Sequence, residues 1–288
     1  MEEKIILNGR LVEEKDAVIP VKDYGVLYGF QLFETMRAYS GKIPDFERHM
    51  TRLRQSAKKI GMDIPPTNHE IESQISKLLK SNSLSNAYVR FAITFGDGGE
   101  RFAFKKCTPN TFIFCKSLPE NLDEIQEKGV SASVTKDFAR NPKSITSKIK
   151  SGNYLENILA KKQAKDAGFF DTILLDADGN IAEFSTANIF IVQDGILKTP
   201  TLQAILPGIT RETVLDIAAK TGLKYSEADI SLNDLNKSTE VFLTNTTLEI
   251  VPVVKIDDKK VGLGVPGDIT KRLQAEYKKK FRLGDGVF

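Results

Sequence analysis

The spacing of apolar residues alternates along the chain between the period of a strand and the period of a helix. In the first part, short apolar runs predict strands, and apolar residues three and four apart predict an amphipathic helix over 46–60 that ends at Gly61. A second helix is expected over 69–80, followed by strands at 87–96 and 111–116. This part of the chain is therefore predicted to form an α+β unit.

The second part of the chain contains the same mixture of periods. The pattern predicts a helix over 154–168, a hairpin over 171–183 with an Asp-Gly turn and a strand over 188–192. Further elements are expected at 211–222 (helix), 240–246 (strand), 251–256 (strand) and 269–281 (helix). The polar stretch between the two parts contains Pro and Gly, so we predict a small domain over 1–118, a linker over 119–128 and a large domain over 129–288.

Length and charge agree with this division. A single hydrophobic core rarely grows beyond about 250–300 residues, and this chain has 288 residues, so two packed lobes of α+β class are expected. Hydrophobic residues make up 41% and charged residues 27%, which are ordinary values for a globular protein. The formal net charge is only +3, and the cations are interleaved with acids. We therefore expect no nucleic-acid partner.

Several classes of site are disfavoured by what the chain lacks. The N-terminus has no signal-peptide pattern, and no apolar run approaches the roughly 18–20 residues that a membrane helix needs, so we expect a cytoplasmic protein without a membrane partner. Cys107 and Cys115 provide no disulfide framework, and His49 and His69 are the only histidines. No metal site and no Ser-His-Asp triad are predicted.

A lysine that precedes a helix is the first candidate for chemistry. Lysine forms covalent bonds with carbonyl compounds when burial or a neighbouring cation lowers its pKa. Lys150 is followed by Ser151 and Gly152, which allow the backbone to approach a ligand closely. Lys148 would point to the same side of an extended chain, so the spacing alone does not separate the two lysines. For an isolated lysine, a solvated surface charge would be the default interpretation.

Two further motifs gain meaning only beside that lysine. The sequence LPGITR runs from a Pro-Gly turn directly into a predicted helix, with Thr210 near the helix N-terminus, where unpaired N–H groups favour an anion. Glu183 ends a hairpin strand and is either an exposed strand-end charge or the partner of a protonated ring nitrogen. Together with the lysine, these motifs suggest pyridoxal phosphate as a cofactor.

These motifs also carry a family resemblance. The stretch 183–211 resembles the class IV pyridoxal-phosphate aminotransferases through E-x-S-x-x-N-I-F, L-x-T and L-P-G-I-T-R. Similar segments follow the order expected for this group: LYGFQLFETMRAYSGKI, HMTRL, RNPKS, IKSGNYLENILA and LTNTTLEIVPV. The group contains branched-chain aminotransferases, D-amino acid aminotransferases and aminodeoxychorismate lyases. The resemblance implies the two-lobed fold-type IV architecture of the D-amino acid aminotransferases, a homodimer and pyridoxal phosphate between the lobes.

The resemblance also implies roles for individual residues in cofactor binding. Lys150 stands three residues before the Asn153-Tyr154 pair and matches the Schiff-base lysine, with Lys148 as the fallback. The other cofactor contacts that it implies are Tyr154 at the ring oxygen, Glu183 at the pyridine nitrogen, and Arg52, Ile209, Thr210 and Thr246 at the phosphate.

The implied substrate pocket is less uniform. The resemblance assigns its lining to Tyr28, Phe33, Tyr88, Arg90 and Thr247, with Arg90 binding a carboxylate. The D-amino acid branch has an Arg-x-His carboxylate trap beyond the strand of Arg90. In this chain Arg101 is displaced by about one position, with Phe102 or Ala103 in place of the histidine. Glu34-Thr35 replaces a usual Glu-Gly, and Gln31 replaces a usual glycine.

The function implied by the resemblance is transamination between an amino acid, branched-chain or D-, and a 2-oxo acid such as 2-oxoglutarate. The alternative is a 4-amino-4-deoxychorismate lyase, which uses the same cofactor and releases pyruvate. GDGGE and RNPKS resemble the lyase branch, whereas Tyr88 and Tyr154 favour a transaminase. A cofactor-free binding scaffold is disfavoured, because the lysine, the glutamate, the arginine and the Gly-Ile-Thr turn all occur together.

Overall fold

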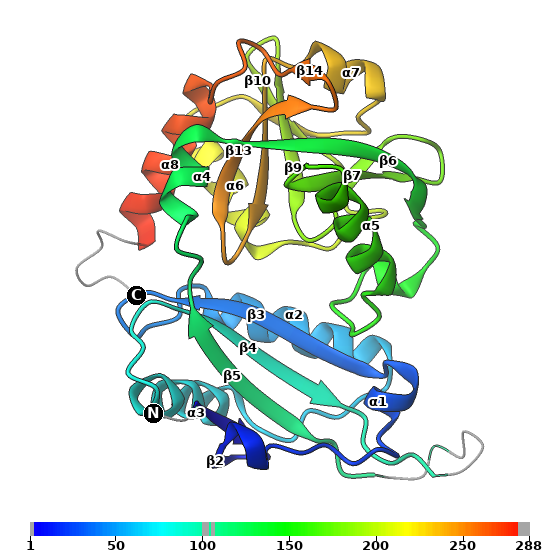
Figure 1. The fold of residues 1–288 in the computed structure, drawn as a ribbon, viewed down its shortest axis with the longest axis vertical. Helices are drawn as coiled ribbons and strands as arrows, with labels where there is room; N and C mark the ends of the chain where they lie inside the picture. The colour runs from blue at the N-terminus through cyan, green and yellow to red at the C-terminus, as the bar shows by residue number, and fades with distance from the viewer. Residues whose placement is uncertain (1–2, 100–103, 105–106, 282–288) are drawn as a thin grey trace. The chain divides into compact units, whose positions relative to one another are not determined.

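The chain folds into two compact units, each with its own sheet (Figure 1). A computed structural model describes residues 3–99, 104 and 107–281. Unit 1 comprises Met1–Leu118 with Ile149–Asn153, and unit 2 comprises Pro119–Lys148 with Tyr154–Phe288. The mixed helix and strand content of both units confirms the predicted α+β class.

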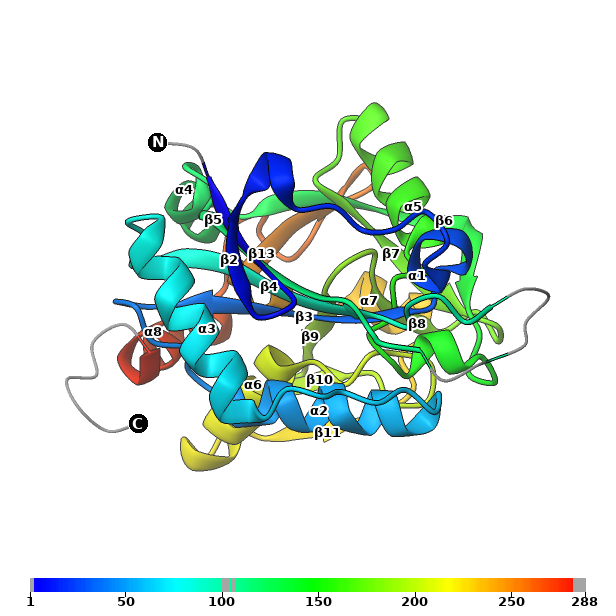
Figure 2. The same cartoon turned by 90° about the horizontal axis from the view of Figure 1, so that it is seen from below.

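Unit 1 is built on a five-stranded antiparallel sheet with the strand order β2-β1-β5-β4-β3. The strands are β1 (Lys4–Leu7), β2 (Arg10–Glu13), β3 (Gln31–Ala38), β4 (Ala87–Thr94) and β5 (Thr111–Ser117). The helices of this unit are η1 (Glu14–Asp16, 3-10), α1 (Tyr24–Tyr28), α2 (Phe46–Lys59) and α3 (Asn68–Ser81). Figure 2 shows α2 and α3 against this sheet.

Alternation along β3 determines what each face of the sheet carries. Leu32 and Met36 are fully buried and share one core with Met50 and Leu53 of α2. Because successive side chains on a strand point to opposite faces, Phe33 and its same-face neighbours lie on the side of the sheet away from the helices. One face of unit 1 is thus a hydrophobic core, and the other is available for polar and aromatic side chains.

Unit 2 contains a nine-stranded mixed sheet with the order β11-β10-β9-β12-β13-β6-β7-β8, and β14 pairs with β13. Its strands are β6 (Val130–Arg140), β7 (Asp171–Asp176), β8 (Ile181–Phe184), β9 (Asn188–Gln193), β10 (Ile196–Thr199), β11 (Tyr225–Glu227), β12 (Glu240–Asn245), β13 (Glu249–Ile256) and β14 (Lys259–Lys260). Its helices are α4 (Leu122–Lys128), η3 (Ile145–Ser147, 3-10), α5 (Leu155–Asp166), α6 (Ile209–Lys220), α7 (Leu232–Lys237) and α8 (Asp268–Phe281).

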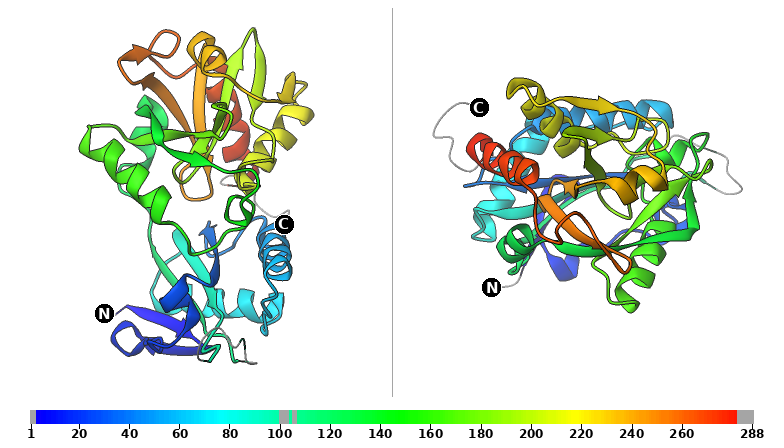
Figure 3. Two further views of the ribbon diagram at one scale, coloured as in Figure 1. Left: turned by 90° about the vertical axis from the view of Figure 1, so that its right-hand side faces the viewer. Right: turned by 90° about the horizontal axis from the view of Figure 1, so that it is seen from above.

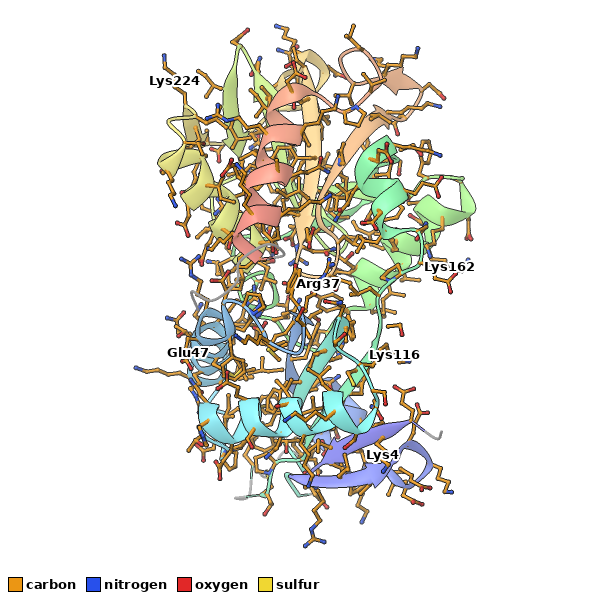
Figure 4. The ribbon with its side chains drawn as sticks, turned by 90° about the vertical axis from the view of Figure 1, so that its left-hand side faces the viewer. Lys4, Arg37, Glu47, Lys116, Lys162 and Lys224 are labelled. Atoms are coloured by element: carbon orange, nitrogen blue, oxygen red, sulfur yellow. The ribbon has the colours of Figure 1, made fainter. Side chains whose placement is uncertain are left out.

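The helices of unit 2 pack on the sheet through small and apolar side chains. Helix α5 packs on β6 and β7, and α6 and α8 pack against each other and against β12 (Figure 3). The outer side of α5 carries the exposed apolar residues Leu155, Ile158 and Leu159 together with charged residues, among them Lys162, which extends away from the helix (Figure 4). In the described part of the chain, no helix is both long and apolar enough to cross a membrane.

The domain prediction differs from the structure in two places. The expected linker over 119–128 contains helix α4, which packs on β13 and belongs to unit 2. The expected large domain over 129–288 does not retain Ile149–Asn153, because this segment pairs with a strand of unit 1. Both differences arise from contacts between residues far apart in sequence, which local composition does not report. The first boundary, after Leu118, coincides with the predicted one.

Candidate active site

The segment that carries Lys150 is attached to β3 by backbone hydrogen bonds. Phe33 N donates to Lys150 O at 3.0 Å, Gly152 N donates to Gln31 O at 2.9 Å, and Ser151 bridges to Leu32. A Cβ at Gly152 would lie 2.1 Å from Gln31 Nε2, so glycine allows this close approach without displacement of the Gln31 side chain. The pairing gives Lys150 a defined position on unit 1.

Three of the predicted residues meet on the sheet face away from the helices. Arg90 Cζ lies 3.7 Å from the centroid of the Phe33 ring, and Lys150 Nζ lies 4.5 Å from the same centroid. Cations at these distances are attracted to the face of an aromatic ring. Lys150 is half-buried, whereas Lys148 is exposed beyond the 3-10 helix η3. This difference in burial favours Lys150 over Lys148 as the nucleophile.

Arg52 is held by a buried acid on the opposite, core-facing side of β3. Its Nε donates to Glu34 Oε1 at 2.8 Å and its second guanidinium nitrogen donates to Oε2, while His49 Nδ1 lies 2.8 Å from Oε2. Burial alone would raise the pKa of Glu34, but the Arg52 charge and the hydrogen bonds lower this pKa to about 2. Burial lowers the pKa of His49, so the neutral ring donates from Nδ1 to the carboxylate.

Glu183 is buried in unit 2, at 5% exposure, near the end of β8. Its Oε1 lies 2.9 Å from Arg140 Nε, and its Oε2 accepts a hydrogen bond of 3.3 Å from Leu206 N. The N–H of Arg140 Nε is not directed at an acceptor among the described residues, so the contact with Glu183 is an ion pair. A neighbouring guanidinium favours the ionised form of a carboxylic acid. Glu183 is therefore suited to be an anion.

The start of α6 is shaped as a small anion site. Gly208 is the N-cap of α6, without a side-chain cap, and the N–H groups that follow it have no acceptor within the helix. A Cβ at Gly208 would lie 1.9 Å from Asn188 Oδ1, and Asn188 Nδ2 donates to Leu206 O at 3.0 Å. Asn188 therefore fixes the loop before Ile209 and Thr210. Unpaired N–H groups and the helix dipole attract phosphate at such a position.

The turn that carries Thr246 and Thr247 lies between β12 and β13. Leu248 N donates to Asn245 Oδ1 at 2.8 Å, and both threonines are half-buried. Thr244, near the end of β12, pairs with Asn188, the first residue of β9. The side chain of Asn188 holds the loop before α6, so the turn begins beside this loop. Unit 2 thus gathers Glu183, the start of α6 and the threonine turn at one end of its sheet.

The other predicted residues lie in regular positions. Tyr154 is the N-cap of α5, Tyr88 lies on β4 with its ring 5.9 Å from that of Phe114, and Tyr28 ends α1 at 50% exposure. The alternative carboxylate ligand Arg101, with Phe102 and Ala103, lies outside the described residues. On unit 1 the structure thus brings together Lys150, Phe33 and Arg90, whereas Arg52 is paired with Glu34 on the other side of β3.

Comparison with known proteins identifies the family. The sequence profile described as Amino-transferase class IV matches residues 31–256. The chain belongs to the class IV aminotransferases. It is 41% identical over 277 residues to the putative branched-chain-amino-acid aminotransferase of Methanocaldococcus jannaschii, covering 96% of this chain and 95% of that protein. It is 32% identical over 273 residues to the D-alanine aminotransferase of Bacillus licheniformis, with 94% of each covered.

A solved structure extends the match to three dimensions. The branched-chain amino acid aminotransferase of Escherichia coli superposes with a TM-score of 0.91 at 31% identity, over 98% of this chain and 95% of that one. The fold-type IV architecture predicted from the sequence is thereby confirmed. Class IV aminotransferases depend on pyridoxal phosphate, so this chain is a pyridoxal-phosphate-dependent aminotransferase.

The residues of the class IV enzyme fit this cofactor. The aldehyde of pyridoxal phosphate reacts with an amine, its ring nitrogen pairs with an acid, and its phosphate accepts hydrogen bonds from several N–H and O–H donors. The N-cap of α6, Gly208, provides no side-chain cap for the first N–H groups of this helix. The buried hydroxyl of Thr244, two residues before Thr246, lacks a partner among the described residues. Glu183, ion-paired with Arg140, supplies a buried acid.

Sequence reasoning missed the partners of the predicted residues in the class IV enzyme. Arg140 stands in the RNPKS segment, but nothing in the spacing connects it with Glu183. Glu34 carried a detectable signal, because it is an acid between Leu32 and Met36 on the apolar face of a strand. An acid at such a position requires buried partners, which His49 and Arg52 of α2 provide.

The pairing of Glu34 predicts how the stability of the cofactor-free aminotransferase depends on pH. A carboxyl group whose pKa falls from 4.5 to about 2 on folding stabilises the fold fully above pH 4.5, and this contribution is lost as the pH falls toward 2. Replacing Glu34 with Gln should therefore lower the free energy of unfolding at pH 7 by about 3 kcal/mol. In urea titrations, the difference from wild type should shrink below pH 4.5.

The matched control is Glu47→Gln, on the exposed side of α2 (Figure 4). This variant should stay within about 0.5 kcal/mol of wild type at all pH values. A Glu34→Gln defect that is the same at pH 7 and pH 3 would contradict the assigned pKa.

Proposed function

We propose that this aminotransferase transfers the amino group of a branched-chain amino acid to a 2-oxo acid such as 2-oxoglutarate. The observation that carries the proposal is the cluster of Lys150, Phe33 and Arg90, which combines a nucleophile, an apolar wall and a cation for a carboxylate on one sheet face. The 41% identical putative branched-chain-amino-acid aminotransferase supports this donor. D-amino acids are the second candidate donors, supported by the D-alanine aminotransferase relative.

In the proposed reaction each side chain has a defined task. Bound pyridoxal phosphate supplies an electron sink that acidifies the α-carbon of the amino acid. Lys150 holds the cofactor before the substrate arrives and then removes the proton from the substrate α-carbon. Glu183 holds a proton at the pyridine nitrogen, Tyr154 contacts the ring oxygen, and Tyr28, Tyr88 and Thr247 line the substrate pocket. Arg52, Ile209, Thr210 and Thr246 bind the phosphate.

Titration with L-branched-chain amino acids and with D-alanine tests the proposed donor. L-leucine, L-valine and L-isoleucine should convert the cofactor to its amine form in single-turnover absorbance measurements, and 2-oxoglutarate should reverse the change. Faster conversion by D-alanine than by every branched-chain amino acid would assign the enzyme to the second candidate. Release of pyruvate from 4-amino-4-deoxychorismate, with the cofactor returned as the aldehyde, would support the lyase alternative.

Arg90 is expected to bind a substrate carboxylate. Loss of a bidentate, charge-assisted contact costs about 2–4 kcal/mol, which corresponds to a decrease in kcat/KM of roughly thirty- to a thousandfold. The Arg90→Leu variant should show this loss with amino acids. Simple amines, which lack the carboxylate, should react at nearly the wild-type rate.

Lys116→Leu is the control for Arg90→Leu. Lys116 lies on β5, is exposed and extends from unit 1 (Figure 4). Its replacement removes a cation of the same sheet and should leave kcat/KM unchanged. Equal losses for an amino acid and for its carboxylate-free amine in Arg90→Leu would end the proposed role, and Arg101 would be tested next.

We further propose that the enzyme is a homodimer. Helix α1 and the loop before it expose Val18, Val21, Val26, Leu27 and Tyr28 at 50–77%. Exposed apolar side chains that gather in one place are typical of a protein–protein interface. Sedimentation velocity of the purified protein tests the proposal, and a monomer at micromolar concentration would refute it.

A further inference from the structure

A glutamine outside the proposed site holds the turn of Thr246 and Thr247. Gln126, on α4, is 3% exposed, and its Nε2 donates to Leu248 O at 2.8 Å and to Glu249 Oε2 at 3.1 Å. Because both partners are acceptors, the amide NH2 must face the turn, which fixes the orientation of this side chain. A helix that lies about 120 residues earlier in the chain therefore constrains the turn.

Glu249 has an unusual backbone for a residue with a side chain. Its φ is +61°, in the left-handed region, and it is 2% exposed. Left-handed backbone is costly for a residue with a Cβ and is usually occupied by Gly or Asn. A buried glutamate at this position indicates that a side-chain acceptor oxygen is needed there, since glycine would suit the backbone better. The carboxylate is the acceptor for Gln126.

Both ends of the turn are fixed to other elements. At its start, Asn245 Nδ2 donates to Thr186 O at 3.4 Å, and within the turn Asn245 Oδ1 accepts from Leu248 N at 2.8 Å. At its end, Gln274 Nε2 of α8 donates to Gln126 O at 2.9 Å and to Ile250 O at 3.0 Å. Helices α4 and α8 thus hold by hydrogen bonds the chain that directly follows Thr247.

We propose that Gln126 and Glu249 are positioning residues that hold the threonine turn so that the Thr246 hydroxyl is directed at a phosphate group. This inference rests on the proposed function, in which Thr246 donates to the cofactor phosphate. A hydroxyl on a hairpin turn contributes to binding only when its backbone is held close to the productive geometry. The buried amide and carboxylate provide that restraint without touching the ligand.

The test compares two ligands that differ only in the phosphate. The dissociation constants of pyridoxal phosphate and of pyridoxal are measured on the cofactor-free protein by equilibrium dialysis. Gln126→Met keeps the side-chain volume and removes both donors, so it should weaken pyridoxal phosphate binding by roughly tenfold and leave pyridoxal binding unchanged. Gln126→Glu places a carboxylate next to two acceptors, Leu248 O and the Glu249 carboxylate, and should weaken pyridoxal phosphate binding further.

Two variants serve as controls. Glu249→Gln retains an acceptor oxygen for Gln126 and should stay within about twofold of wild type. Gln193→Met removes a glutamine of unit 2 that accepts from Lys198 and lies at the other end of β9. It should change neither dissociation constant.

Thr246→Ala separates failure of the inference from failure of the proposed function. Thr246→Ala should itself weaken pyridoxal phosphate selectively, and the double variant with Gln126→Met should lose no more than the larger single loss, since both act through one contact. If Thr246→Ala changes neither affinity, the proposed phosphate role of the turn fails. If Thr246→Ala shows the selective loss and Gln126→Met does not, the positioning role fails and the function stands. Equal losses for both ligands in Gln126→Met would also overturn the positioning role.

Discussion

Lys150→Ala is expected to abolish transamination while leaving a folded protein. The lysine is the nucleophile and the proton carrier in the proposed reaction, and loss of a positioned base alone slows reactions by on the order of 10²–10⁴-fold. The variant should lack the visible absorbance of the covalently held cofactor. Borohydride reduction of wild-type enzyme, followed by peptide mapping, should find the cofactor on residue 150.

Lys148→Ala is the matched control, because Lys148 stands two residues earlier and is exposed. It should retain the absorbance and the activity of wild type. Recovery of the borohydride-trapped cofactor on residue 148 would reverse the assignment. Thermal unfolding of both variants without cofactor shows whether a loss arises from the chemistry or from the fold.

The two lysines illustrate what periodicity could not decide. Alternation places Lys148 and Lys150 on one side of an extended chain, so the sequence leaves both open. The structure bends the chain between them: Lys148 caps the 3-10 helix η3, and Lys150 pairs with β3. Register between distant segments depends on tertiary contacts, and a local pattern does not contain this information.

Long amphipathic elements were predictable, and short ones were not. The helices expected over 46–60, 69–80 and 269–281 are confirmed as Phe46–Lys59, Asn68–Ser81 and Asp268–Phe281. Helices α1 and α4, with five and seven residues, were missed. Helices of one or two turns present too few apolar positions to define a period. They depend on caps and tertiary contacts, such as the Asp23 side chain that accepts from Gly25 N.

The candidate site was predictable where a motif is contiguous. Gly208 precedes α6 as the sequence indicates, but the helix begins at Ile209, two residues before the expected start at 211. The hydrogen bond between Gln126 and Glu249 beside the threonine turn was not predictable, because the two residues are separated by 123 positions and neither residue type is unusual alone. Glu249 becomes informative only when its φ is known.

Glu183→Gln is expected to have the second largest effect. The variant retains the size of the side chain but provides no carboxylate to hold a proton at the pyridine nitrogen. The bound cofactor should remain, because Lys150 and the phosphate donors are unchanged. Removal of the substrate α-proton should slow by roughly a hundred- to a thousandfold, the usual effect of deleting one preorganised electrostatic group. Stopped-flow absorbance with deuterated and protiated substrate measures this step.

The ion pair with Arg140 makes a stability control necessary for Glu183→Gln. A buried guanidinium that loses its acid destabilises the fold, so the urea unfolding of the variant is measured beside its kinetics. Glu240→Gln supplies the comparison, because Glu240 accepts from Ile269 N and Thr270 N at the start of α8 and has no role in the proposed reaction. Glu240→Gln should lose stability and keep its rate. In Glu183→Gln, the rate of α-proton removal should fall far more than the loss of folding stability explains. An unchanged rate of proton removal would show that Glu183 has only a structural role.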